Sequence, residues 1–206
     1  MSLEARLWML AVVFAAAFVI LAILVVSTSA ISRIDVAAGV LRGHATATAA
    51  LFTLSGRAIP LLGLGLLSML LFIAFKRPLW IPPAIFASQI VSQGAVEGIK
   101  HLLARTRPDD WLVTHEIGFS FPSGHAATAI VFFGAWLLVV AALPMDRPLK
   151  FALIGLLLVW MLGIDWSRLA LGAHYLSDVL GGTLFGCAWL SALLALCLRL
   201  RIFQGV

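Results

Sequence analysis

Charged residues are scarce in this chain, and their scarcity excludes an ordinary soluble domain. Only 11% of the 206 residues are Asp, Glu, Lys or Arg, whereas 63% are hydrophobic. Soluble domains carry about 25% charged residues. Most of this chain therefore requires lipid around it, and its long hydrophobic segments are predicted to be membrane helices.

Runs of basic residues and pairs of bridging cysteines are also missing. The formal net charge is +5, but the 14 lysines and arginines occur singly or in twos near the ends of apolar segments. A nucleic-acid interface would gather them into a patch with aromatic residues, so this pattern favours anionic lipid headgroups over nucleic acid. The only cysteines, Cys187 and Cys197, lie ten positions apart in one apolar segment, too far for a disulfide on a helix.

Six apolar stretches are long enough to cross a bilayer, which takes about 20 residues per helix. They leave little sequence for a second domain, so we expect one membrane-embedded, all-α bundle over residues 1–206. The first stretch ends in small residues that resemble a signal-peptidase site, but it is too long for a signal-peptide core, which favours a retained helix. The stretches are 7–28, 58–75, 79–103, 124–143, 149–171 and 175–198.

The basic residues near the ends of these stretches favour a cytoplasmic amino terminus. Seven lie on each side of a six-span protein, but three on the outer side, Lys100, Arg107 and Arg168, belong to motifs that predict ligand binding. The remaining bias of seven to four follows the positive-inside rule. We therefore expect a bacterial cytoplasmic (inner) membrane protein whose motifs face the periplasm or exterior.

Two connections between the stretches are long. Residues 29–57 space charged residues among apolar ones and can form an amphipathic helix at the membrane interface. Residues 104–123 are unusually polar, and two interpretations remain open for them: recognition of a lipid headgroup, or an ordinary solvated loop. The polar residues concerned are Asp109, Asp110, Trp111, His115 and Glu116.

Three motifs collect ionisable residues at what should be one membrane surface. Lys100 is followed after six residues by Arg107-Pro108, residues 122–125 read Pro-Ser-Gly-His, and residues 167–178 read Ser-Arg-x5-His-x3-Asp. Three permanent cations in a low-dielectric groove repel one another unless an anion lies among them. A phosphate suits this set, because guanidinium groups bind its oxygens in pairs and a helix begins near Ser123 and Gly124.

The third motif also predicts a nucleophile. His174 and Asp178 are four residues apart, so on a helix the carboxylate can hold one ring nitrogen while the other faces phosphorus. His125 would supply a proton to the leaving group. Asp178 can also neutralise Arg168, and we expect Glu97 and Asp165 to be charge partners of Lys100 and Arg168 rather than catalytic acids.

Together the three motifs resemble those of the type 2 phosphatidic acid phosphatase family, which is related in fold to the vanadium haloperoxidases. The match covers residues 100–178 without a departure from the family pattern. The resemblance implies a metal-free lipid phosphatase with no cofactor. It assigns His174 as nucleophile, Asp178 as its orienting carboxylate and His125 as acid, and it implies a phosphoryl site made of Lys100, Arg107, Ser123, Gly124 and Arg168.

The resemblance implies a lipid phosphate or diphosphate substrate and leaves its tail and headgroup open. Undecaprenyl diphosphate and phosphatidylglycerol phosphate lead among the family's bacterial substrates, followed by phosphatidic acid and lipid A phosphates. A lipid transporter is a remote alternative from another functional class, and it would place ionisable residues near the bilayer midplane and show a repeated half. A vanadate-dependent peroxidase would need a largely soluble body. The sequence carries no sign of oligomeric state.

Overall fold

The computed structural model describes residues 1–28, 31–108, 116–200 and 202, and within these ranges it is helical without strands, as the composition predicts. The helical elements are α1 (Leu3–Ser27), α2 (Arg33–Ala38), the 3-10 turn η1 (Gly39–Leu41), α3 (Thr46–Ser55), α4 (Ala58–Ala74), α5 (Ile81–Leu103), α6 (Gly124–Thr128), the π-helical turn η2 (Ala129–Gly134), α7 (Ala135–Ala142), α8 (Arg147–Ala170) and α9 (Leu176–Arg199).

All six predicted stretches are helical, but six membrane spans are not confirmed. Four helices are long and apolar enough to cross a bilayer: α1, the continuous run 124–142, α8 and α9. A fifth span results if α3 and α4, which meet at 58°, are counted as one. The described part of the chain is thus a multi-pass membrane protein with four or five candidate spans. The 23-residue helix α5 falls outside this count.

Polar side chains in the middle of α5 turn toward the bundle rather than toward lipid. The amide nitrogen of Gln89 donates to the Thr128 hydroxyl at 2.7 Å, and that of Gln93 donates to the same hydroxyl at 2.9 Å and to the Gly124 carbonyl at 3.0 Å. Polar groups in a membrane bundle are accommodated by such interhelical hydrogen bonds. These bonds tie α5 to the beginning of α6.

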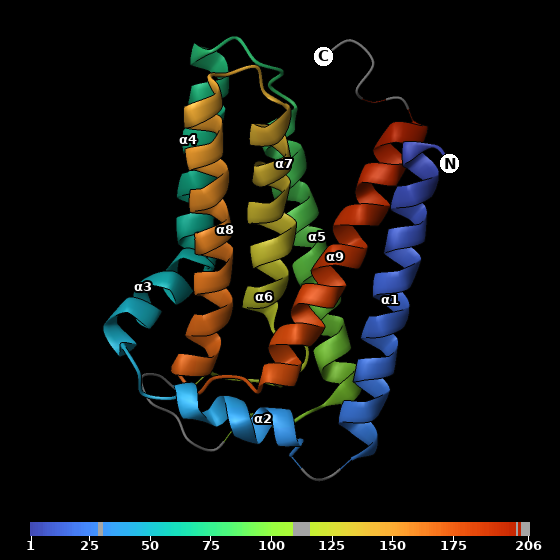
Figure 1. The fold of residues 1–206 in the computed structure, drawn as a ribbon, viewed down its shortest axis with the longest axis vertical. Helices are drawn as coiled ribbons and strands as arrows, with labels where there is room; N and C mark the ends of the chain where they lie inside the picture. Colours follow the sequence, from blue (N-terminus) through green and yellow to red (C-terminus); the bar gives the residue numbers. More distant parts are fainter. Residues whose placement is uncertain (29–30, 109–115, 201, 203–206) are drawn as a thin grey trace.

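The long helices run side by side, with their connections gathered at two opposite ends (Figure 1). The start of α1, the end of α9 and the α4–α5 and α7–α8 connections lie at one end, whereas α2 and the α8–α9 connection lie at the other. α1 packs along α9, and α3 packs against α8. Inside, α4, α5, η2 and α8 share a core of apolar side chains: Leu61, Ile85, Ala129, Phe132, Phe133 and Ile164.

The connection predicted to be an amphipathic helix forms three short elements, α2, η1 and α3, and its residues 29–30 lie outside the described residues. α2 lies across the end of the bundle (Figure 1). It is amphipathic, with Asp35 2% exposed while Ile34 and Val36 are 49% and 66% exposed. Asp35 therefore faces the protein, whereas Ile34 and Val36 face outward, as does the exposed Arg33.

A close approach between α9 and the Pro-Ser-Gly-His turn sets the position of that turn. A Cβ at Gly182 would lie 2.3 Å from the Ser123 carbonyl oxygen, a distance that no side chain tolerates. The Ser123 amide also donates to the Asp178 carbonyl at 2.9 Å. The lack of a side chain at Gly182 therefore lets the second and third motifs come together.

Candidate active site

His174 lies at the end of the bundle beside α2, between a carboxylate and a guanidinium. Its Nδ1 is 3.4 Å from Asp178 Oδ2, and its Nε2 is 3.1 Å from an Arg107 nitrogen. Arginine can only donate, so Nε2 must be the acceptor and Nδ1 must carry the proton toward the carboxylate. The ring therefore presents a lone pair on the side where Arg107 lies, which is the state that a nucleophile requires.

Asp178 is held by its own helix as well as by the imidazole. It is the third residue of α9, and its Oδ2 accepts the Tyr175 amide at 2.9 Å, which forms part of a capping box. A carboxylate at a helix amino terminus also lies at the positive end of the helix dipole. The predicted contact between His174 and Asp178, four residues apart, thus forms across the start of α9, because His174 lies just before the helix.

Arg107 connects the first motif to the third. Its guanidinium donates to the Ala173 carbonyl and its Nε donates to the Gly118 carbonyl, each at 3.0 Å. These two bonds fix the side chain beside the His174 ring. Residues 104–108 follow the end of α5, so Arg107 links that end to the α8–α9 connection.

Arg168 is fully buried near the end of α8 and has two oxygen partners. One nitrogen lies 2.9 Å from Glu116 Oε1, and another donates to the Thr53 hydroxyl of α3. Its Nε has no hydrogen-bond partner among the described residues. A buried guanidinium with an unused donor has capacity for a further acceptor, such as a phosphoryl oxygen.

His125 lies at the beginning of α6, against the carboxyl end of α3. Its Nε2 is 3.2 Å from the Thr53 carbonyl oxygen, which can only accept, so this nitrogen carries a proton. The ring fits there because the neighbouring residue of α3 lacks a side chain: a Cβ at Gly56 would lie 2.7 Å from the ring. Ser123 caps the helix by accepting the Ala126 amide at 3.4 Å.

Lys100 completes the group from α5. Its ammonium lies 3.4 Å from Glu97, which is the charge partner that the sequence predicts. It also lies near Gly124, since a Cβ there would be 4.0 Å from the ammonium nitrogen. Lys100, Gly124 and His125 are thus neighbours at the amino terminus of one membrane helix.

The protonation state of His174 depends on its burial and on the neighbouring cations. Burial, followed by the positive charges of Arg168, Arg107 and Lys100, holds the pKa of His174 well below its ordinary value. Each of these effects penalises the imidazolium. The ring is therefore neutral at neutral pH, as a nucleophile must be.

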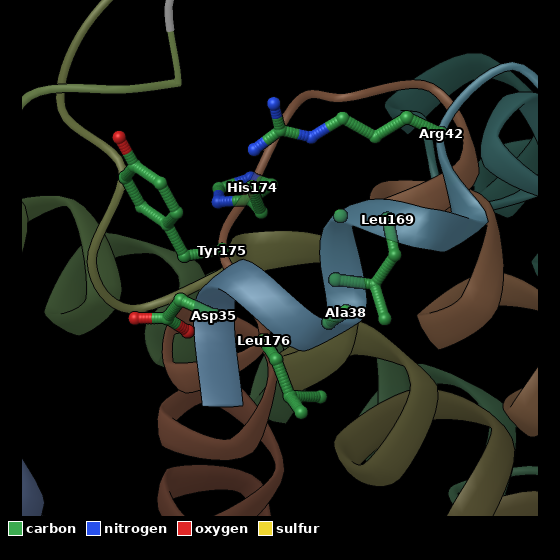
Figure 2. A pocket seen from close by; sticks show the side chains of 8 residues that line it. Asp35, Ala38, Arg42, Leu169, His174, Tyr175 and Leu176 are labelled. Atoms are coloured by element: carbon green, nitrogen blue, oxygen red, sulfur yellow. The ribbon is translucent and has the colours of Figure 1, made fainter. Parts of the chain in front are cut away.

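A narrow pocket between α2 and the start of α9 borders His174 on one side (Figure 2). Arg42, from the turn after η1, extends over α2 toward the side where the imidazole lies, and Tyr175 stands on the other side (Figure 2). Asp35, Ala38 and Gly39 also line this pocket. α2 and η1 thus cover His174 from outside the bundle.

Two sequence predictions about charge partners are wrong. Asp165 does not hold Arg168: it lies 3.4 Å from the Thr183 hydroxyl of α9, because its carboxylate faces α9 while the guanidinium turns to α3. Asp178 does not neutralise Arg168 either, since its cationic partner is Arg105 at 2.5 Å.

The interpretation of residues 104–123 as an ordinary solvated loop fails for Glu116. Its side chain is 21% exposed and pairs with Arg168. Burial alone would raise the pKa of Glu116, but the charge and hydrogen bond of Arg168 outweigh it and lower this pKa to about 2. The other residues named for this loop, Asp109, Asp110, Trp111 and His115, lie outside the described residues.

Sequence reasoning missed Arg105, Asp35, Ser177 and Thr53 as part of the site. In the sequence, Arg105 counts only as one of the outer basic residues and as part of the polar segment 104–123, although it stands two positions before Arg107. Asp35 was assigned to a surface helix, and Thr53 lies in a Thr/Ala-rich segment without a motif. Contacts between distant parts of the chain bring these residues to the site, and the spacing of residues along the sequence does not predict such contacts.

The side chains that could act as metal ligands are relevant to the expectation of a metal-free site. Within residues 1–28, 31–108, 116–200 and 202, no group of three or more His, Cys, Asp or Glu side chains could hold a metal ion. Both cysteines are free and half-buried in α9. Cations of the protein itself surround His174 instead.

Comparisons with known proteins agree with the motifs. Lipid A 1-phosphatase of Rhizobium johnstonii is 34% identical over 130 residues, which cover 57% of this chain and 48% of that protein. Phosphatidylglycerophosphatase B of Bacillus subtilis is 37% identical over 92 residues, 43% of this chain and 44% of that protein. Its namesake in Escherichia coli K12 is 39% identical over 89 residues, 42% and 32%. The chain thus spans less than half the length of these relatives.

A solved structure resembles the whole chain. The crystal structure of a transmembrane PAP2 type phosphatidylglycerolphosphate phosphatase from Bacillus subtilis superposes with a TM-score of 0.78 at 26% identity, covering 96% of this chain and 99% of that one. The model of the PAP2 superfamily matches residues 79–201, which contain all three motifs. The chain described here belongs to the PAP2 superfamily.

Proposed function

We propose that this protein is a lipid phosphatase that acts through a phosphohistidine at His174. The observation that carries the proposal is the position of the neutral imidazole, with Asp178 behind Nδ1 and Arg107 in front of Nε2. In the reaction, Nε2 forms a bond to phosphorus and the bond from phosphorus to the leaving oxygen breaks. Water then attacks the phosphohistidine, releasing inorganic phosphate and restoring the imidazole.

Lys100, Arg107 and Arg168 act in this proposal as the phosphoryl cradle, together with Ser123 and the backbone at Gly124. Their charges stabilise the equatorial oxygens in the transition state, where phosphoryl transfer gains most of its rate. His125 donates the proton that the leaving oxygen needs. Its place at the start of α6, beside Gly124, supports this role.

The substrate class follows from the surroundings of the site. The site lies at one end of a bundle of long apolar helices, so we propose a substrate whose tail stays in the bilayer while its phosphate enters the cradle. Phosphatidylglycerol phosphate is favoured by the names of the relatives, and undecaprenyl diphosphate stands beside it as the second candidate. Phosphatidic acid and lipid A phosphate complete the panel to be tested.

The test is release of inorganic phosphate by purified protein in detergent, at one ratio of detergent to lipid, for all four lipids. We expect His174→Ala to abolish release, and Asp178→Asn to lower it by about 10⁴-fold if it acts like the orienting carboxylate of other catalytic triads. A wild-type protein that releases no phosphate from any of the four lipids would overturn the proposal.

We also propose six spans in a bacterial inner membrane, with the site at the periplasmic end. The hydrogen bonds of Gln89 and Gln93 to Thr128 let α5 cross the bilayer with its polar face inside the bundle. Single cysteines at positions 44, 77 and 145, in a protein with Cys187 and Cys197 replaced by Ser, test this topology. Position 44 should react with an impermeant reagent from outside, and positions 77 and 145 only after permeabilisation.

A further inference from the structure

The guanidinium of Arg105 lies between two carboxylates that come from distant parts of the chain. One of its nitrogens is 2.5 Å from Asp178 Oδ1, and another is 3.2 Å from Asp35 Oδ2 in α2. Its plane also lies over the Tyr175 ring, with 4.5 Å from its carbon to the ring centroid. This arginine therefore connects α2 to the start of α9.

Asp35 is itself anchored to the start of α9. Its carboxylate accepts the Ser177 amide and the Ser177 hydroxyl, each at 2.8 Å. Burial alone would raise the pKa of Asp35, but these hydrogen bonds, that of Ser32 and the charge of Arg105 outweigh it and lower this pKa. Asp35 is therefore an ionised group under a six-residue helix, in contact with the residue next to Asp178.

The two oxygens of Asp178 divide their partners between the imidazole and this arginine. Oδ2 faces His174 and the Tyr175 amide, whereas Oδ1 faces Arg105. A carboxylate bound on one side by a guanidinium has its plane fixed, so its other oxygen is aimed at Nδ1 of the imidazole. Arg105 therefore controls the direction and the charge of the group behind the nucleophile.

Building on the phosphatase reaction proposed above, we propose that Arg105 and Asp35 are positioning residues for His174. Asp35 holds one edge of the guanidinium, Arg105 holds Asp178, and Asp178 orients the ring that attacks phosphorus. Neither residue belongs to the phosphoryl cradle, so their effect should fall on the chemical step rather than on substrate binding.

Other charges also face the imidazole and its carboxylate, and they bear on the pH dependence. They come from α5, from the α5–α6 connection and from α8, and Arg42 reaches toward His174 from the turn after η1 (Figure 2). These charges remain in place when Arg105 is replaced, so they are a constant background. They belong to Lys100, Arg107, Glu116 and Arg168.

The experiment compares phosphate release by Arg105→Gln, Arg105→Lys, Asp35→Asn and the double variant Asp35→Asn/Arg105→Gln. Outer partners of catalytic groups contribute about 10- to 100-fold, so kcat of Arg105→Gln should fall by this factor while KM changes less than about twofold. Arg105→Lys should recover part of kcat because it restores the cation. Adding Asp35→Asn to Arg105→Gln should cost little more, since Asp35 acts on Asp178 through Arg105 and Asn can still accept the Ser177 hydrogen bonds.

The pH profile separates positioning from a merely structural role. Without the cation, the imidazole and carboxylate pair takes up a proton more readily, so the acid limb of kcat should move to higher pH in Arg105→Gln and back in Arg105→Lys. Arg33→Gln is the matched control, because Arg33 is an exposed cation on the same helix as Asp35. It should leave kcat, KM and the profile unchanged.

Three results would overturn the positioning role: Arg105→Gln with wild-type kcat, a loss that appears only in KM, or an unshifted acid limb. If Arg105→Gln does not fold, Arg105→Lys and Asp35→Asn provide the same test, with a smaller expected decrease in kcat and a smaller shift of the acid limb. These outcomes concern variants of an active protein. Failure of the proposed phosphatase function would appear instead as the absence of phosphate release by the wild type.

Discussion

The carboxylate of Glu116 lies 2.9 Å from the guanidinium of Arg168 and 3.6 Å from that of Arg57. An anion of the protein is thus bound to a cation that the proposed mechanism reserves for the phosphoryl group. A phosphate entering the cradle must compete with Glu116 for Arg168, so this carboxylate weakens substrate binding while keeping the buried arginine paired.

Replacing Glu116 with Gln should therefore strengthen anion binding. The amide keeps the shape of the side chain and removes the charge, so we expect inorganic phosphate to inhibit at about threefold to tenfold lower concentration, equivalent to ~1 kcal/mol. Glu97→Gln is the comparison, because its partner is also a cradle cation but Glu97 is 57% exposed and its effect should be smaller. Weaker inhibition by phosphate in Glu116→Gln would contradict this account.

The low pKa of His174 predicts activity that persists into mildly acidic solution. The folded protein keeps this ring neutral where an unfolded histidine, with a pKa of about 6.5, is protonated. The acid limb of kcat/KM should therefore lie below about pH 6.5, measured between about pH 5 and pH 8. Because the folded state binds fewer protons here, the contribution of His174 to stability should decline as pH falls below about 6.5.

The substrate needs its own control in this experiment, since phosphate monoesters lose their second proton near pH 6. A ³¹P NMR titration of the same lipid in the same detergent gives that value. An acid limb that stays above about pH 6.5 after this correction would show that the ring is protonated more easily than its surroundings indicate.

The contact between Gly182 and Ser123 predicts a large effect from one methyl group. Gly182→Ala should push the Pro-Ser-Gly-His turn away from α9, destabilising the protein by about 1–3 kcal/mol and lowering kcat. Gly155→Ala in α8 is the control, because a Cβ there meets nothing within 4 Å. Thermal unfolding in detergent and phosphate release measure the two effects, and equal behaviour of the two variants would refute the packing argument.

Metal removal should leave turnover unchanged. In the proposed mechanism the cations around His174 supply the positive charge that a metal would otherwise provide, so incubation with EDTA should not lower kcat. Vanadate should inhibit, because it resembles the pentacoordinate state of phosphoryl transfer. Loss of turnover with EDTA, restored by magnesium, would require a different mechanism.

The helices and motif positions of this protein were predictable because they depend on local sequence. Apolar runs predict the helix at 124–142 and α9 to within a residue or two at their ends, since lipid leaves a buried backbone few alternatives to helix. The spacing of His174 and Asp178 also predicts their contact, because both lie within one turn of the start of α9. The predicted count of six spans is not confirmed, because α5 carries polar side chains toward the bundle and is not among the helices apolar enough to cross a bilayer.

The wider site could not be read from spacing. Arg105 and Asp178 are 73 residues apart, and their contact exists only because the residues just after α5 lie beside the start of α9. Asp35 is 142 residues from Ser177, and its burial depends on how α2 crosses the end of the bundle. Charge pairing was predicted from neighbours on the same helix, which is right for Glu97 and wrong for Asp165, whose carboxylate faces another helix.

The outward apolar side of α2 has a consequence for how turnover should be measured. Ile34 and Val36 are suited to rest among acyl chains while Asp35 is anchored beneath them. In the proposed function, a lipid reaches His174 by lateral diffusion within its own leaflet, without leaving for bulk water. The concentration that governs its turnover is its mole fraction in the bilayer or micelle, so diluting a substrate with inert detergent should slow the reaction even when its bulk molarity is constant.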